Sequence, residues 1–228
     1  MMEQLSIRSF LKNGHEYHLY VFEDVENVPD GVILKDAGEI LPADRIFKYK
    51  QNGSVSAFSN LFRYKLLLER GGYWADTDVI CLKPFNFHSE YVFAEEELTE
   101  DSKQVSSNII KVPAGCEIMK FCFENSEAKD RDALQWGEIG PGLVTVAVSK
   151  FGLNRYVHPY TIFNPINWWH RDDFIREDIR TQIRVRWKLR NRPYSLHLWH
   201  EMWRRDGKDK NQTFAKRSLF ERLKKKYL

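Results

Sequence analysis

Two aspartates one residue apart, Asp76 and Asp78, are the side chains of this 228-residue chain with the clearest chemical potential. They lie in the mostly apolar segment 73–82 (YWADTDVICL), which predicts a central strand. Alternate side chains of a strand share one face, so the two carboxylates would converge. Paired carboxylates suit a hard divalent cation, Mn²⁺ or Mg²⁺, which also binds substrate phosphates. We therefore expect a metal site here, with two ordinary aspartates at a solvated strand end as the alternative.

The spacing of these aspartates is weak support when taken alone. With 14 Asp in 228 residues, chance predicts about one such pair. A second pair does exist, Asp130 and Asp132, in a polar stretch that we expect to be a solvated loop. The apolar setting of Asp76 and Asp78 is what distinguishes the first pair from the second.

Further polar residues lie on the elements expected next to this strand. Arg63 lies on the preceding helix, close enough in sequence to belong to the same site. Taken alone, it could equally form an ordinary ion pair at the surface. In the expected strand 194–199, Ser195, His197 and Trp199 share one face. His197 is expected to contact a metal ion or phosphate, and the Trp199 N–H to donate to a phosphate oxygen. A buried histidine and a core tryptophan are equally open interpretations.

The elements that must position these residues mix helices with strands, which predicts an α/β class. The best helix covers 55–70, with Ser54 or Ser56 as its cap and Gly71-Gly72 as its end. Other helices are expected over 5–11, 116–126, 143–151 and 218–228. Other strands are expected over 17–22, 91–94, 108–112, 160–163 and 183–190, the last from its strict alternation of apolar and cationic residues.

Composition narrows the class of protein further. The chain is 43% hydrophobic and 14% aromatic, which excludes a disordered chain, and we expect one domain over 1–228. No stretch is long and apolar enough for a membrane span, and the N-terminus has no apolar signal core. Three Cys without a CxxC pair favour neither a disulfide framework nor a zinc site. We expect a cytoplasmic protein.

Charge is unevenly distributed, because residues 171–228 hold 18 Lys and Arg against 8 Asp and Glu. The segment 213–228 predicts a basic helix with an apolar stripe opposite Lys224, Lys225 and Lys226. We expect peripheral attachment of this helix to anionic lipid at the inner face of the membrane, with docking on its own domain as the alternative. Nucleic-acid binding is not expected, because no nucleic-acid motif accompanies the charge.

The segment 57–85 (AFSNLFRYKLLLERGGYWADTDVICLKPF) resembles the DxD-containing sugar-binding region of glycosyltransferase family 32. That family includes bacterial capsule and lipopolysaccharide glycosyltransferases. The resemblance implies a GT-A fold, a Rossmann-like mixed sheet flanked by helices. It also implies a metal-dependent, retaining transfer of a hexose from a UDP- or GDP-hexose. The acceptor would be a glycan or lipid-linked precursor in the biosynthesis of a bacterial surface polysaccharide.

The same resemblance assigns functions to individual residues. Asp76, Asp78 and Arg63 would be catalytic, and Asp76, Asp78 and His197 would hold Mn²⁺ or Mg²⁺. The substrate-binding residues would be Asn60, Trp74, Asn108, Ser195 and Trp199. These groups suit the chemistry, because breaking the sugar–diphosphate bond leaves negative charge that cations and N–H donors stabilise.

Two departures from the family pattern leave a second interpretation open. Asn60 stands where the family has Asp, and the segment matching the family's first helix begins at Glu3, so we expect the strand that precedes it to be absent. A sheet without that strand would expose an unpaired edge. The alternative is a homologue that binds nucleotide-sugar without turnover. A haloacid-dehalogenase-type phosphatase is disfavoured, because its Asp motif lies on the first strand.

Overall fold

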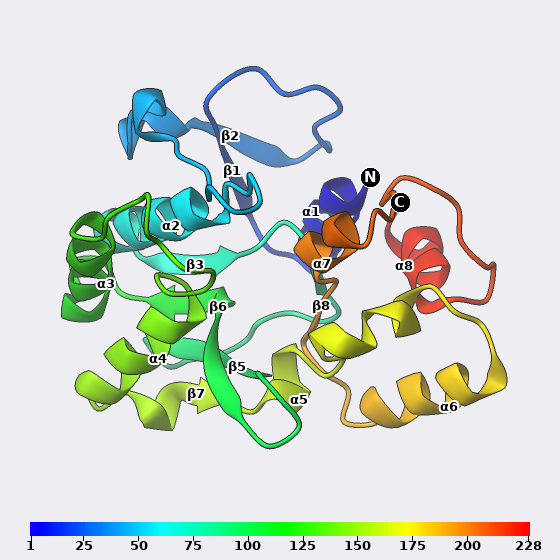
Figure 1. Ribbon diagram of the computed structural model, residues 1–228. Coiled ribbons are helices and arrows are strands. Elements are labelled where there is room, and N and C mark those ends of the chain that lie inside the picture. The colour runs from blue at the N-terminus through cyan, green and yellow to red at the C-terminus, as the bar shows by residue number, and fades with distance from the viewer.

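The computed structural model describes residues 1–228 and confirms the α/β class (Figure 1). The helices are α1 (Met2–Lys12), α2 (Ser56–Arg70), α3 (Glu117–Glu127), α4 (Pro141–Lys150), α5 (Tyr160–Phe163), α6 (Ile179–Lys188), α7 (His200–Arg205) and α8 (Leu219–Tyr227). The strands are β1 (Tyr17–Val21), β2 (Val32–Asp36), β3 (Gly72–Ala75), β4 (Val79–Cys81), β5 (Val92–Glu97), β6 (Lys103–Val112), β7 (Val157–His158) and β8 (Ser195–His197). Short 3-10 helices cover Ala37–Glu39, Ala43–Arg45, Asn154–Tyr156 and Trp168–Phe174.

The strands form three sheets of mixed direction. The largest has the order β3-β6-β5-β7, in which only the β5–β7 pair is parallel. Strands β1 and β2 pair in parallel, and β4 pairs with β8 in antiparallel. Strand β3 is therefore an edge strand of its sheet and not the central strand expected from the apolar segment 73–82.

Helices flank these sheets, as expected for a mixed sheet of GT-A type. In Figure 1, α3 and α4 lie beside the four-stranded sheet, while α6 and α8 lie at the other end of the molecule. One core cluster joins Tyr64 and Leu67 of α2 to α3, α4 and β6. Another joins α1, β8 and α8. The segment around β3, β4 and β8 connects these two halves of the molecule.

Two expected strands are helices. The segment 160–163 forms α5, in which the Asn164 N–H donates to the Tyr160 carbonyl at 2.7 Å. The alternating segment 183–190 lies mostly in α6, which Asp178 caps by accepting from the Thr181 N–H at 3.0 Å. Thr181 and Val185, four residues apart, are buried, so burial follows the helical period and not the alternation. A helix satisfies its own backbone and needs no neighbouring strand.

The C-terminal helix is docked on its own domain. Its apolar stripe, Leu219, Phe220, Leu223 and Tyr227, is at most 5% exposed and packs in the cluster that contains α1. Ser218 caps the helix, so it begins at Leu219 and not near 213. The stripe is therefore not available to a bilayer, and the docked alternative is the one observed. No helix of the structure has both the length and the apolar composition needed to cross a membrane.

Candidate active site

Asp76 and Asp78 lie in the turn between β3 and β4, which corrects the prediction of one continuous strand over 73–82. The Val79 N–H donates to the Asp76 carbonyl at 3.0 Å and closes the turn. Strand β3 before the turn pairs with β6, while β4 after it pairs with β8. The carboxylates therefore converge through a turn between two sheets, and not through the alternation of a single strand.

Backbone and side-chain hydrogen bonds hold this turn from several sides. The Asp76 N–H donates to the Asn108 carbonyl at 2.9 Å, and the Leu198 N–H donates to the Asp78 carbonyl at 3.0 Å. On α1, the buried Ser9 hydroxyl accepts from the Cys81 N–H at 2.8 Å. The turn is thus tied to β6, to the end of β8 and to α1, which lowers the conformational freedom of both carboxylates.

Asp78 and His197 form the first half of the site. The Asp78 Oδ2 lies 3.3 Å from the His197 Nε2 and accepts from the His200 N–H at 2.9 Å. Burial alone would raise the pKa of Asp78, but the His197 imidazole and the His200 N–H outweigh burial and lower it to about 2. Asp78 is therefore an ionised carboxylate at neutral pH.

Asp76 and Arg63 form the second half of the site. The Asp76 Oδ1 accepts from the Arg63 Nη2 and from the Trp74 Nε1, both at 2.6 Å. Arg63 is 3% exposed, donates its Nη1 to the Ser107 carbonyl and lies 4.7 Å from the centre of the Trp74 ring. Burial raises the pKa of Asp76, the Arg63 guanidinium opposes that effect, and the Asp78 carboxylate adds to it. A second cation beside Asp76 would therefore be favoured electrostatically.

The donor atoms of Asp76, Asp78 and His197 lie within 4.8 Å of one another, close enough for one metal ion. Two carboxylate oxygens fit a hard divalent cation such as Mn²⁺ or Mg²⁺. The imidazole nitrogen makes the set softer than an all-oxygen site, which favours Mn²⁺ over Mg²⁺. The buried His197 Nδ1 has no hydrogen-bond partner, so this ring nitrogen is free to bind a further group at the site. The residues present therefore fit a divalent metal ion.

Asn60 and Asn108 lie near this centre but are buried. The Asn60 Oδ1 accepts from the Ser107 hydroxyl at 3.4 Å, on the residue whose carbonyl accepts from Arg63. Asn108 donates to the Asn164 Oδ1 at 2.7 Å, and its own Oδ1 is buried without a partner. The backbone carbonyls of Ser107 and Asn108 accept from Arg63 and Asp76, and contact of either asparagine with a sugar stays a prediction.

Ser195 and Trp199 have other partners in this structure. Ser195 is fully buried, and its hydroxyl donates to the Phe163 carbonyl at 2.8 Å. The Trp199 indole N–H donates to the Ile166 carbonyl at 2.7 Å, and its ring lies 3.9 Å from that of His197. Both donors are occupied in this structure, so contact of Ser195 or Trp199 with a phosphate stays a prediction.

Three groups beside the two aspartates were not identified from the sequence. Tyr17 of β1 is close enough that Asp76 and Asp78 add to the effect of burial in raising its pKa. Burial raises the pKa of the buried Glu96 of β5, while His197 lowers it and Asp76 raises it further. The His200 N–H bonds Asp78. Only the acidic run Glu95–Glu97 inside an apolar segment could have signalled one of them.

Comparison with known proteins finds one family region, in the N-terminal part of the chain. Residues 2–99 match the family model described as "Glycosyltransferase sugar-binding region containing DXD motif", a segment that includes Arg63, Asp76 and Asp78 and ends before His197. This match confirms the resemblance at the level of a glycosyltransferase sugar-binding region. No curated protein matches the chain. Among solved structures, the chain is similar to "PaToxG Glycosyltransferase" at 13% identity, covering 98% of this chain and 78% of that one, with a TM-score of 0.49.

Proposed function

We propose that this chain is a metal-dependent, retaining glycosyltransferase of the family 32 type that uses a UDP- or GDP-hexose. Its acceptor would be a glycan or lipid-linked precursor of a bacterial surface polysaccharide, made in the cytoplasm. One observation carries the proposal: Asp76, Asp78 and His197 converge on one point, and both aspartates lie inside the matched sugar-binding region.

The residues around that point suit transfer from a nucleoside diphosphate. When bound, a divalent ion would offset the negative charge that develops on the diphosphate leaving group. Arg63 and Trp74 fix the orientation of the Asp76 carboxylate through hydrogen bonds to its Oδ1. His197 and the His200 N–H do the same for Asp78. Carboxylates held in advance need little reorganisation when the donor binds.

The second candidate function is binding of a nucleotide-sugar without turnover. The contacts of Arg63 support this candidate. Two guanidinium nitrogens of Arg63 are already bonded to Asp76 and to the Ser107 carbonyl, and Asn60 beside it carries no charge. A hydrolysis and transfer assay with UDP- and GDP-hexoses in Mn²⁺ separates the two candidates. Release of nucleoside diphosphate supports the enzyme, whereas binding without release supports the second candidate.

The test of the metal site is the variant Asp78→Asn. It removes one anionic ligand while keeping the shape of the side chain, so calorimetry should show Mn²⁺-dependent UDP binding weakened by more than about 100-fold. The matched control is Asp132→Asn, in the exposed second DxD pair, which should bind as the unmodified protein does. Unchanged binding by the Asp78→Asn protein would contradict the metal site.

A further inference from the structure

An exposed apolar ridge lies along α6, on the outer face of that helix. Ile179, Ile183 and Trp187 are four residues apart, so they stand in one line. Their exposed fractions are 73%, 63% and 59%, although residues of these types are usually buried. Thr181 and Val185 on the opposite face anchor the helix to the protein. The ridge is therefore held outward, with its side chains mostly exposed.

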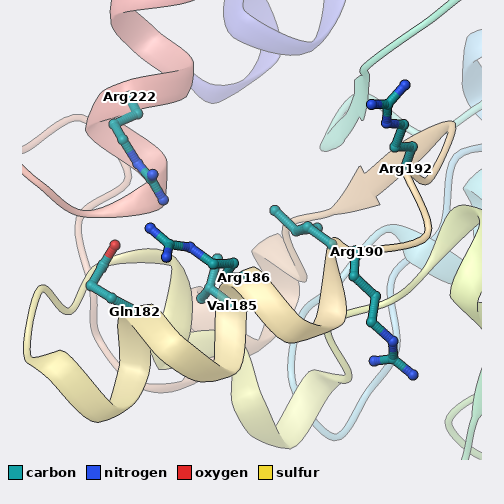
Figure 2. A pocket seen from close by; sticks show the side chains of 7 residues that line it. Gln182, Val185, Arg186, Arg190, Arg192 and Arg222 are labelled. Carbon is teal, nitrogen blue, oxygen red and sulfur yellow. The ribbon is translucent and has the colours of Figure 1, made fainter.

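Cations surround this ridge and line the groove between α6 and α8. The groove has a volume of about 400 Å³ and is lined by Gln182, Val185, Arg186, Leu189, Arg190, Arg192 and Arg222. Figure 2 shows the guanidinium groups of Arg186 and Arg222 pointing toward one another across it. A second hollow, next to the first, adds Lys216, Arg217 and Lys225. Like charges facing each other across a groove repel, so an anion between them would be stabilising.

The carboxylates near this groove already have partners. Glu221 is paired with Lys224 and also accepts from the Phe214 N–H. Asp178 caps α6 at Thr181, and Asp173 is paired with Arg184. Arg186, Arg190, Arg192 and Arg222 form no ion pair, although Arg190 lies 3.8 Å from the Trp187 ring. The surface has positive charge that the protein itself leaves uncompensated.

We infer that this surface of α6 and α8 docks the protein on an anionic lipid bilayer. The ridge would enter the boundary between head groups and acyl chains, where tryptophan is favoured. The arginines of the groove would contact lipid phosphates at the same depth. The apolar ridge favours a bilayer over nucleic acid, whose recognition needs no exposed aliphatic line. The inference does not depend on the transferase activity.

Vesicle co-sedimentation tests the charged part of the surface. The protein should sediment with phosphatidylcholine vesicles that hold roughly one third phosphatidylglycerol, and far less with phosphatidylcholine alone. Each arginine near an anionic surface contributes a factor of about five, so Arg186→Gln with Arg222→Gln should weaken binding by about 25-fold. The matched control is Lys48→Gln with Lys120→Gln, which removes the same charge from exposed positions elsewhere.

The apolar part of the surface is tested by Ile183→Ser with Trp187→Ser. Both side chains are exposed, so the protein should fold normally, while binding to anionic vesicles should fall at least about tenfold. Failure of the unmodified protein to sediment with anionic vesicles would overturn the inference. So would an equal loss in the lysine control, or binding of the unmodified protein to a DNA duplex without binding to anionic vesicles.

Discussion

Asp76 and Asp78 have different partners, and this difference sets the charge of the site. Asp76 is paired with a permanently charged guanidinium, whereas Asp78 is paired with an imidazole that can lose its proton. Burial lowers the pKa of His197, but the Asp78, Asp76 and Glu96 carboxylates outweigh burial and raise it. Once a bound cation displaces that proton, the Asp76 and Asp78 carboxylates and Arg63 sum to one negative charge. A divalent cation would turn that into one positive charge, which is the sign that a diphosphate requires.

Trp199, expected to contact a phosphate, has a backbone carbonyl as its hydrogen-bond partner in this structure. Its backbone has a left-handed conformation with φ of 60°, and its indole N–H bonds the Ile166 carbonyl. The variant Trp199→Phe should therefore lose about 1–2 kcal/mol of stability, because that carbonyl loses its donor. Urea unfolding measures the loss, and nucleotide affinity measured by calorimetry should change by less than the stability does.

The control for this variant is Trp187→Phe, at a tryptophan that is 59% exposed. Its stability should change by less than about 0.5 kcal/mol. If Trp199→Phe were as stable as this control but bound UDP much more weakly, the indole would contact phosphate after all.

Sequence reasoning at the residue scale found the charged members of the site but not their partners. The apolar setting singled out Asp76 and Asp78, whereas Arg63 and His197 were assigned to the site through the family resemblance. The actual partner of Ser195, the Phe163 carbonyl, could not be predicted, because it lies on α5, a segment that was expected to be a strand. The sequence does not indicate whether a serine hydroxyl will bond a ligand or a backbone carbonyl.

At the scale of elements, the junction of α2 and β3 positions the two aspartates. Gly71 ends α2 with φ of 63°, and a Cβ there would lie 2.4 Å from the Ala114 nitrogen. Gly72 has φ of 84°, and a Cβ there would have nothing within 4 Å. At both positions the positive φ would strain any other residue. Only at Gly71 would a side chain also collide with the neighbouring backbone.

Alanine at each position separates these two effects. Gly72→Ala should lose about 1 kcal/mol of stability, because of its positive φ alone. Gly71→Ala should lose more than twice that, since the Ala114 backbone must also move, and its Mn²⁺-dependent nucleotide binding should weaken with it. Urea unfolding of both proteins provides the comparison. Equal stabilities would show that the close approach of Ala114 is unimportant.

Helices and strands were predicted correctly where apolar spacing and end residues indicated the same element. The prediction was wrong where one segment fitted both the helical and the strand period. α2 was predicted well, because its apolar spacing and Gly71-Gly72 indicate the same helix and the same end. The cap of α2 was not, since Val55 and not a serine side chain precedes it. α6 was predicted as a strand, because IRVRWKLR alternates; its burial at Thr181 and Val185 became visible only once it was packed.

At the scale of the whole molecule, the site exists because separate sheets meet at one turn. β3 leads into it from the sheet of β6, and β4 leaves it paired with β8, which brings His197 to Asp78. The family match covers residues 2–99 and so contains the aspartates but not this histidine. No spacing rule predicts a contact between segments so far apart, whereas the β4–β8 pairing fixes it.

The most direct test of this account is anomalous diffraction from crystals grown with Mn²⁺ and UDP. We expect one manganese peak bound by Asp76 and Asp78, with the His197 ring beside it and a diphosphate oxygen on its open side. The same crystals of the Asp78→Asn protein should lack the peak. A diphosphate bound without manganese, or manganese bound elsewhere while the two carboxylates point apart, would contradict the account.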